Sequence, residues 1–199
     1  MDGSFSATFQ IGANAGQVLD INIAELTAEK LGASPQSGVA ARGADKALAN
    51  GDLVLNGVAI GPSTAGDDTA SLSAADASAI AKAAAINKKS AETGVTAYVN
   101  DNVVNGSKMV AATATTGDTA TLSINGVTIN LASTANINDV DKAATRTSVI
   151  AAVNAVAGQT GVTALDGGND NGVILVAADG RNITLAATGG NSDLSAFGL

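Results

Sequence analysis

The first candidate for chemistry in this sequence is an acidic, glycine-rich segment that could hold a cation. It reads Asp166-Gly167-Gly168-Asn169-Asp170-Asn171-Gly172, and hard cations such as calcium are bound by carboxylate and amide oxygens. However, the sixth position is Asn171, where an EF-hand loop needs glycine, and the twelfth is Ala177, where it needs glutamate. We therefore interpret the segment as a solvated connection between two strands.

The other polar motifs have simpler explanations. Asn105-Gly106-Ser107 and Asn182-Ile183-Thr184 fit the N-glycosylation pattern, which occurs often by chance. Gly66-Asp67-Asp68 and Gly117-Asp118 are interpreted as polar turns before an element. Lys88-Lys89 lies near the expected end of a helix, where the helix dipole favours cations.

The composition excludes several classes of active site. The 199 residues include no His and no Cys, which removes Ser-His-Asp and Cys-His machinery, thiolate metal sites and disulfides. The net charge of −8 and the lack of a basic stripe argue against binding to nucleic acid. No run of 18 apolar residues predicts a membrane span. We predict no catalytic residue, no cofactor and no metal ligand, and the chain is not expected to be an enzyme.

The elements that would position side chains occur twice. The first copy covers residues 53–97 and the second copy residues 122–164, and each reads as strand, Asn-Gly turn, strand, polar loop, helix and strand. The turn asparagines, Asn56 and Asn125, are 69 residues apart, and the glycines that open the last strand are 67 apart. A duplicated module without residues typical of an active site indicates a structural role in preference to a catalytic one.

Each Asn-Gly pair suits a two-residue type I′ turn, because both central residues of that turn need positive φ. Such a turn gives each hairpin one apolar face that needs a cover. The pairs predicted on the apolar face are Leu122–Ile129, Ile124–Val127, Leu53–Ile60 and Leu55–Val58, with Ser123–Thr128 and Val54–Ala59 behind.

A helix is predicted to supply the cover in each copy. The first helix is expected from about Ala74 to Glu92, with Ser73 as N-cap and Leu72 as a hydrophobic staple. The second is expected to begin at an Asp139 N-cap and to stop at Gly158. The side chains expected to face the sheets are Ile80, Ala83, Ala84, Ile86, Val149, Ile150, Val153 and Val156.

Further strands flank the two copies. Residues 173–177 and 182–186 are predicted to form a hairpin through Asp179-Gly180, and residues 103–112 are expected in the equivalent place after the first copy, with a turn at Asn105-Gly106. At the other end, residues 4–23 read as a hairpin. Its expected turn covers residues 12–16, a short helix follows at 24–32, and a linker follows at 33–43.

These elements predict an α+β fold. It consists of an N-terminal β-hairpin followed by two related ββαβ(ββ) modules with mostly antiparallel sheets, each covered by a helix. The predicted domains are residues 1–40, 41–117 and 118–199. Met1 before Asp2-Gly3-Ser4 is interpreted as an added start on an internal fragment.

Two parts of the sequence resemble a known family. Phe9-Gln10-Ile11-Gly12-Ala13-Asn14-Ala15-Gly16-Gln17 resembles the hairpin that follows the N-terminal helical region of bacterial flagellins, and Asp2-Gly3-Ser4 resembles the end of their Leu-Leu-Asp-Gly segment. The two Asn-Gly-Val units resemble the flagellin hook IN motif, which is found in the variable region of flagellins and in filament-cap proteins. The hairpin string is specific, whereas the repeat motif is diffuse.

The resemblance implies a structural component of the flagellar filament, secreted through the flagellar apparatus and located outside the cell. Its partners would be other flagellin subunits, through terminal helices that this sequence lacks, so the fragment is expected to be monomeric. Glycans or a host surface are further candidate partners. In the family the sugars are typically O-linked, and the candidate hydroxyls here are those of Thr113, Thr115, Thr116, Ser133 and Thr134. We favour the interpretation that these are ordinary residues of β-rich segments and carry no sugar.

Two alternatives stay open. A filament-cap or hook-associated protein shares the repeat motif, but the hairpin string Phe-Gln-Ile-Gly-Ala-Asn favours a flagellin. A catalytic insert in the variable region is disfavoured because His, Cys and clustered acids are missing from the sequence.

Overall fold

The computed structural model describes residues 6–10, 18–22, 46–190 and 193–199. Contacts between residues divide the chain into two units, Met1–Gly43 and Ala44–Leu199, and each is described by itself. The expected turn at 12–16, helix at 24–32 and linker at 33–43 lie outside the described residues.

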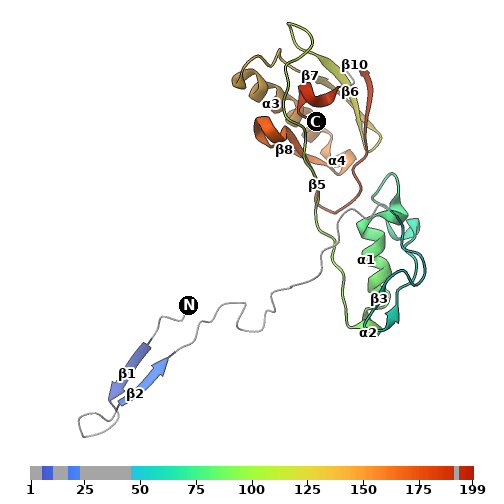
Figure 1. The fold of residues 1–199 in the computed structure, drawn as a ribbon, viewed down its shortest axis with the longest axis vertical. Coiled ribbons are helices and arrows are strands. Elements are labelled where there is room, and N and C mark those ends of the chain that lie inside the picture. Colours follow the sequence, from blue (N-terminus) through green and yellow to red (C-terminus); the bar gives the residue numbers. More distant parts are fainter. Residues whose placement is uncertain (1–5, 11–17, 23–45, 191–192) are drawn as a thin grey trace. The chain divides into compact units, whose positions relative to one another are not determined.

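The first unit contains a two-stranded antiparallel hairpin. Strand β1 (Ser6–Gln10) pairs with β2 (Val18–Asn22) in a register that runs from Ser6 opposite Asn22 to Gln10 opposite Val18. The hairpin predicted from the sequence is thereby confirmed for these strands (Figure 1).

The first copy of the repeat begins with a short hairpin. The φ angles of Asn56 and Gly57 are +49° and +83°, which confirms the predicted type I′ turn. The backbone N–H of Ile60 donates to Leu53 O at 2.8 Å, so the predicted register is correct. The elements of this copy are β3 (Val54–Leu55), β4 (Val58–Ala59), the 3-10 turns η1 (Ala65–Asp67) and η2 (Ala75–Ala77), α1 (Ala79–Asn87) and α2 (Ser90–Thr93).

The first helix is shorter than predicted, and its predicted cap was wrong. Ser78, not Ser73, is the N-cap of α1, because its Oγ accepts the Ala81 N–H at 3.0 Å. Leu72 is 62% exposed and forms no staple. The cause is a long-range contact that local patterns do not reveal, since Ser63 Oγ donates to Asp76 O at 2.6 Å and holds the chain outside the helix there.

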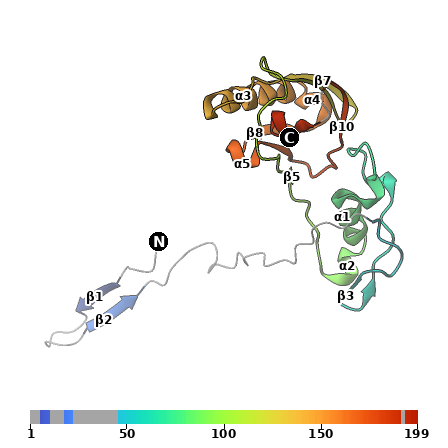
Figure 2. The same cartoon turned by 45° about the horizontal axis from the view of Figure 1, so that its top comes forward.

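The second copy and the residues around it form two three-stranded antiparallel sheets. Their strand orders are β10-β6-β7 and β5-β9-β8, and α3 packs against β7, β8 and β9 (Figure 2). The elements are β5 (Asn102–Val104), β6 (Thr119–Ile124), β7 (Val127–Ala132), α3 (Asp139–Ala155), α4 (Ala157–Thr160), β8 (Thr163–Asp166), α5 (Gly168–Asn171), β9 (Val173–Ala177), β10 (Leu185–Gly190) and the 3-10 turn η3 (Leu194–Phe197).

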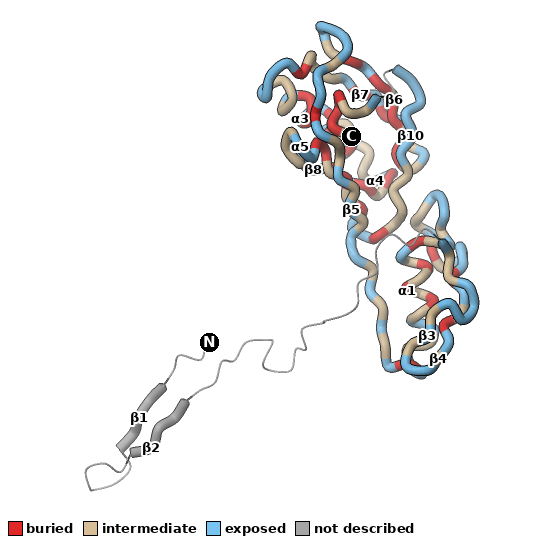
Figure 3. The backbone as a smooth tube through the Cα atoms, in the orientation of Figure 1, coloured by how far each residue is buried: buried red, intermediate tan, exposed pale blue. Residues whose placement is uncertain are grey.

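The core lies between these sheets and α3 (Figure 3). The predicted pairs Leu122–Ile129, Ser123–Thr128 and Ile124–Val127 are confirmed. The predicted helix stripe is also confirmed, with Val149 and Val153 buried and Ile150 and Val156 packed at the margin of the core. The largest fully buried side chains of the unit include Phe197, Ile60, Leu122, Ile124, Leu175, Val149 and Val153.

Two predictions about the ends of α3 were wrong. The N-cap is Asn138, whose side chain accepts from the N–H groups of Val140 and Asp141. Gly158 does not stop the helix but lies inside α4, and the chain turns at Gly161, where φ is +70°. The glycine that opens each Gly-Val-Thr-Ala string therefore closes a helical turn.

The predicted hairpin of residues 173–177 and 182–186 was also wrong. Strand β10 pairs with β6, whereas β9 lies between β5 and β8. Strand β9 is apolar at every position, which is typical of a central strand with partners on both edges. The expected hairpin at Asn105-Gly106 is absent too, because β5 pairs with β9 instead.

The fold is α+β with small antiparallel sheets, as predicted. The division at residues 117 and 118 stays a prediction, and two observations bear on where the copies meet. Residues Ala44–Leu199 group as one unit, and β5, which that division puts in the first module, completes a sheet with β8 and β9.

Candidate functional site

The turn asparagine of each copy is bonded to a helix end. Asn56 Nδ2 donates to Thr93 O at 2.8 Å, and Asn125 Nδ2 donates to Thr160 O at 2.9 Å. The two threonines are the last residues of α2 and α4, whose carbonyls have no intrahelical partner. The hairpin is thus tied to the C-terminal end of the helical segment in both copies.

A second asparagine ties the helix to the segment that follows it. In the second copy this segment is β8, whereas the strand predicted at the same place in the first copy was wrong, because residues 94–101 form no strand. Asn87 Nδ2 donates to Ala97 O at 3.0 Å, and its Oδ1 accepts from Ala97 N–H at 2.8 Å. Asn154 makes the same pair of bonds to Ala164, at 3.1 and 2.8 Å. Each amide side chain thus bonds both backbone groups of one residue, as a neighbouring strand would.

A threonine completes the pattern. The hydroxyls of Thr93 and Thr160 accept from the N–H groups of Val95 and Val162, at 3.1 Å in both copies. Both threonines are buried, at 4% and 0% exposure. We call these shared bonds the polar clamps; they involve Asn56, Asn87, Thr93, Asn125, Asn154 and Thr160.

The spacing of the clamp residues is a signal in the sequence that the predictions above did not use. Thr93 and Thr160 are 67 residues apart, as are Asn87 and Asn154, and this is the spacing of the glycines that follow the threonines. Aligning the two copies by those glycines would have brought the clamp residues into register.

The acidic segment 166–172 connects β8 to β9, which confirms our interpretation of it as a connection between two strands. Two of its side chains, those of Asp166 and Asn169, are bonded to one arginine. Arg146, whose side chain is 7% exposed, donates from Nε to Asp166 Oδ1 and from Nη1 to Asn169 Oδ1. The bond from Arg146 lowers the pKa of Asp166 below its ordinary value, and a bond from the backbone N–H of Gly168 adds to this. Arg146 gave no sequence signal.

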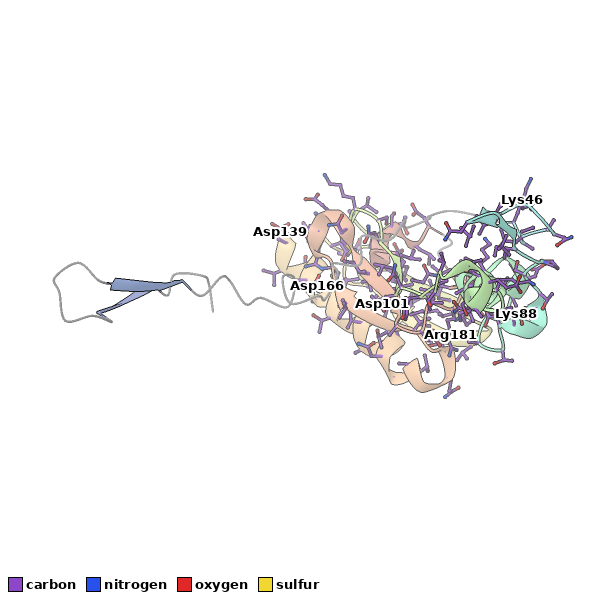
Figure 4. All side chains as sticks on the ribbon, turned by 90° about the horizontal axis from the view of Figure 1, so that it is seen from below. Lys46, Lys88, Asp101, Asp139, Asp166 and Arg181 are labelled. Atoms are coloured by element: carbon purple, nitrogen blue, oxygen red, sulfur yellow. The ribbon has the colours of Figure 1, made fainter. Side chains whose placement is uncertain are left out.

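Within residues 46–190 and 193–199, and in the two described strands of the first unit, no group of three or more acidic side chains could hold a metal ion. Figure 4 labels charged residues of the second unit, and they are spread along it without gathering around one cleft.

The lysine pair occupies the position expected from the sequence. Lys88 is the C-cap of α1, and its Nζ donates to both carboxylate oxygens of Asp67, at 2.7 and 2.8 Å. This bond lowers the pKa of Asp67. Lys89 pairs with Glu92 at 2.7 Å.

The candidate glycosylation residues fall into two groups. Asn105 is exposed, and so are Thr113, Thr115 and Thr116. The others make internal bonds, among them the Thr134 hydroxyl to Asp141 O at 2.9 Å. Residues with internal bonds are Ser133, Thr134 and Asn182, together with Thr113, which bonds Asp118 despite its exposure.

The segment around Asn182, which follows the second copy, is bonded to the first copy. Its N–H donates to Ser71 Oγ at 2.9 Å, and its Nδ2 donates to the carbonyls of Ser73 and Ala74 at 3.0 Å. Beside it, Arg181 pairs with Asp179 at 2.6 Å, and this bond lowers the pKa of the carboxyl.

In the part of the chain that the structure describes, no helix is long and apolar enough to cross a bilayer. Comparison with known proteins adds no assignment: neither a protein-family model nor a curated protein matches this sequence.

Proposed function

We propose that this chain is the outer, variable part of a bacterial flagellin, a structural component of a secreted filament. The observation that carries the proposal is the duplicated module with its polar clamps, which supports an architectural role. The resemblance of residues 9–17 to the flagellin hairpin is the reason for preferring this filament over other repeat proteins.

The surface of the second unit suits a subunit that faces solvent. The chain has a net charge of −8, and like charge opposes sticking between neighbouring filaments. Thr115 and Thr116 are exposed on the segment between β5 and β6, where they are accessible to a glycosyltransferase. The proposed role of this region is therefore to form a soluble, acidic outer surface of the filament. This surface would present antigens, glycans or adhesive contacts.

The contacts that polymerise the filament would come from other parts of the subunit. In this proposal the isolated chain is monomeric. Light scattering of the purified chain tests this, and a stable ordered polymer would contradict it.

Immunoelectron microscopy of the source cells tests the function directly. Antibodies raised against the purified chain are expected to label filaments along their whole length. A strain from which the coding segment has been deleted serves as control. Labelling of the filament tip alone would favour the filament-cap alternative. If the antibodies do not label filaments at all, the proposal is overturned.

The catalytic alternative has its own test. Purified chain is expected to show no turnover of peptide or glycoside substrates above a heat-denatured control. Turnover that is lost on substitution of one acidic residue would overturn the structural proposal for this region.

A further inference from the structure

Five asparagines in this chain are followed directly by glycine. Glycine has no side chain to shield its backbone nitrogen, so this nitrogen can approach the amide carbon of the preceding asparagine. The five residues are Asn50, Asn56, Asn105, Asn125 and Asn171.

The reaction available to such a pair is loss of ammonia. The glycine nitrogen gives up its proton to solvent and bonds to asparagine Cγ, and the Cγ–Nδ2 bond breaks to release ammonia. Water then opens the five-membered imide at either carbonyl, which yields aspartate or isoaspartate. The reaction consumes one water and involves no oxidation or reduction. It is favoured by a free glycine N–H and a mobile asparagine side chain.

Two of the five glycines do not offer a free N–H. Gly51 donates to Ile60 O at 3.0 Å, and Gly172 donates to Gly168 O at 2.8 Å. A donated proton and a fixed nitrogen oppose the attack, so Asn50 and Asn171 are protected by the fold.

The remaining three differ in how the asparagine side chain is held. Asn125 is bonded at both ends, from Nδ2 to Thr160 O and from Thr184 N–H to its Oδ1 at 2.8 Å. Asn56 is bonded at Nδ2 alone, in the polar clamp. Asn105 is exposed, and within the described residues neither its side chain nor the Gly106 N–H makes a hydrogen bond.

We propose that Asn105 is the site at which this chain deamidates itself. Asn105 follows directly after β5, where the chain packs closely against the C-terminal residues. A Cβ on Gly106 would lie 2.0 Å from Gly198 O, and Ser107 Oγ donates to Leu199 O at 2.8 Å. Isoaspartate adds one carbon to the backbone at this position, so the reaction loosens the contact between β5 and the last residues.

Peptide mass mapping of the folded full chain, incubated in mildly alkaline buffer, tests the proposal. The deamidated fraction at Asn105 is expected to grow about tenfold faster than at Asn125, because the two bonds to Asn125 must break before attack. Asn56 is expected to lie between them. In denaturant the rates of the five sites are expected to converge, because all five share the same dipeptide.

Two variants complete the test. Asn105→Gln is expected to remove most of the ammonia released by the folded chain, while the matched control Asn50→Gln leaves the release unchanged. Equal rates at Asn105 and Asn125 in the folded chain would overturn the proposal. A rate order that persists in denaturant would overturn it as well, because the order would then come from neighbouring sequence and not from the fold.

Discussion

The two copies of the repeat share their polar clamps but differ in what they bury. The first copy buries Ile60 and three alanines of α1, at 81, 83 and 85. Around the second copy the buried cluster adds leucine, isoleucine, valine and phenylalanine side chains, from both sheets, α3 and η3. The same hydrogen bonds therefore set the path of the chain around two interiors of different size, and the larger interior supplies more of the hydrophobic stabilisation.

The copies also differ at their edges. Strand β10 lies against β6 in the second copy, and Thr184 adds a bond to the turn asparagine. In the first copy, β3 is paired with β4 alone among the described strands. The second copy is thus the more strongly held, and the following substitutions measure by how much.

The largest effect is expected from Phe197→Ala. Phe197 is fully buried in the core beside the second copy, and its truncation should lower the free energy of unfolding by about 3–5 kcal/mol. Urea denaturation followed by circular dichroism gives this value. Ile60→Ala is the comparison in the first copy, and an equal or larger loss there would contradict the proposed difference between the interiors.

A smaller effect is expected at the clamps. Glycine accepts the positive φ of the turn, so Asn125→Gly and Asn56→Gly remove the side-chain bonds without backbone strain. We expect losses of about 2 kcal/mol for Asn125, which makes two side-chain bonds, and about 1 kcal/mol for Asn56, which makes one. Equal losses would mean that the Thr184 bond adds no stability.

The N-cap of α1 gives a prediction within the first copy. Ser78→Ala should cost about 1 kcal/mol, because it leaves the Ala81 N–H without its cap. Ser73→Ala is the matched control and should change the unfolding free energy by less than about 0.5 kcal/mol. A larger loss of stability for Ser73→Ala than for Ser78→Ala would mean that Ser73 is the N-cap, as expected from the sequence.

The smallest effect concerns pH. Bonds from Arg146 and Arg181 lower the folded-state pKa of Asp166 and Asp179, so both groups stabilise the fold above their unfolded pKa of about 3.9. This stability is lost as the pH falls through the lower, folded-state pKa values. Both side chains are partly exposed, at 53% and 44%, so each pair should contribute less than about 1 kcal/mol.

Unfolding free energies measured across the acidic range test this sign. Asp166→Asn should flatten the dependence, because it removes one of the two carboxyls whose pKa the fold lowers. Stability that rises on acidification would contradict the assignment.

Features set by neighbouring residues could be predicted from the sequence. The Asn-Gly turns, the register of β6 with β7 and the buried stripe of α3 follow from residues a few positions apart. By contrast, the bond of Ser63 to Asp76 ahead of the first helix, the pairing of β10 with β6 and the ion pair of Arg146 with Asp166 join separate segments of the chain. No local pattern encodes those contacts.

The spacing of the polar clamps has a consequence for which part of the chain each copy needs in order to close them. The turn asparagine and its threonine are 37 residues apart in the first copy and 35 in the second, and the bonds of Asn87 and Asn154 span 10. The entropic cost of closing a loop grows only slowly with its length, so the clamps of the two copies close at a similar cost in chain entropy. Both partners of every clamp bond lie within one copy, so each copy carries in its own segment of chain all the groups that its clamps need.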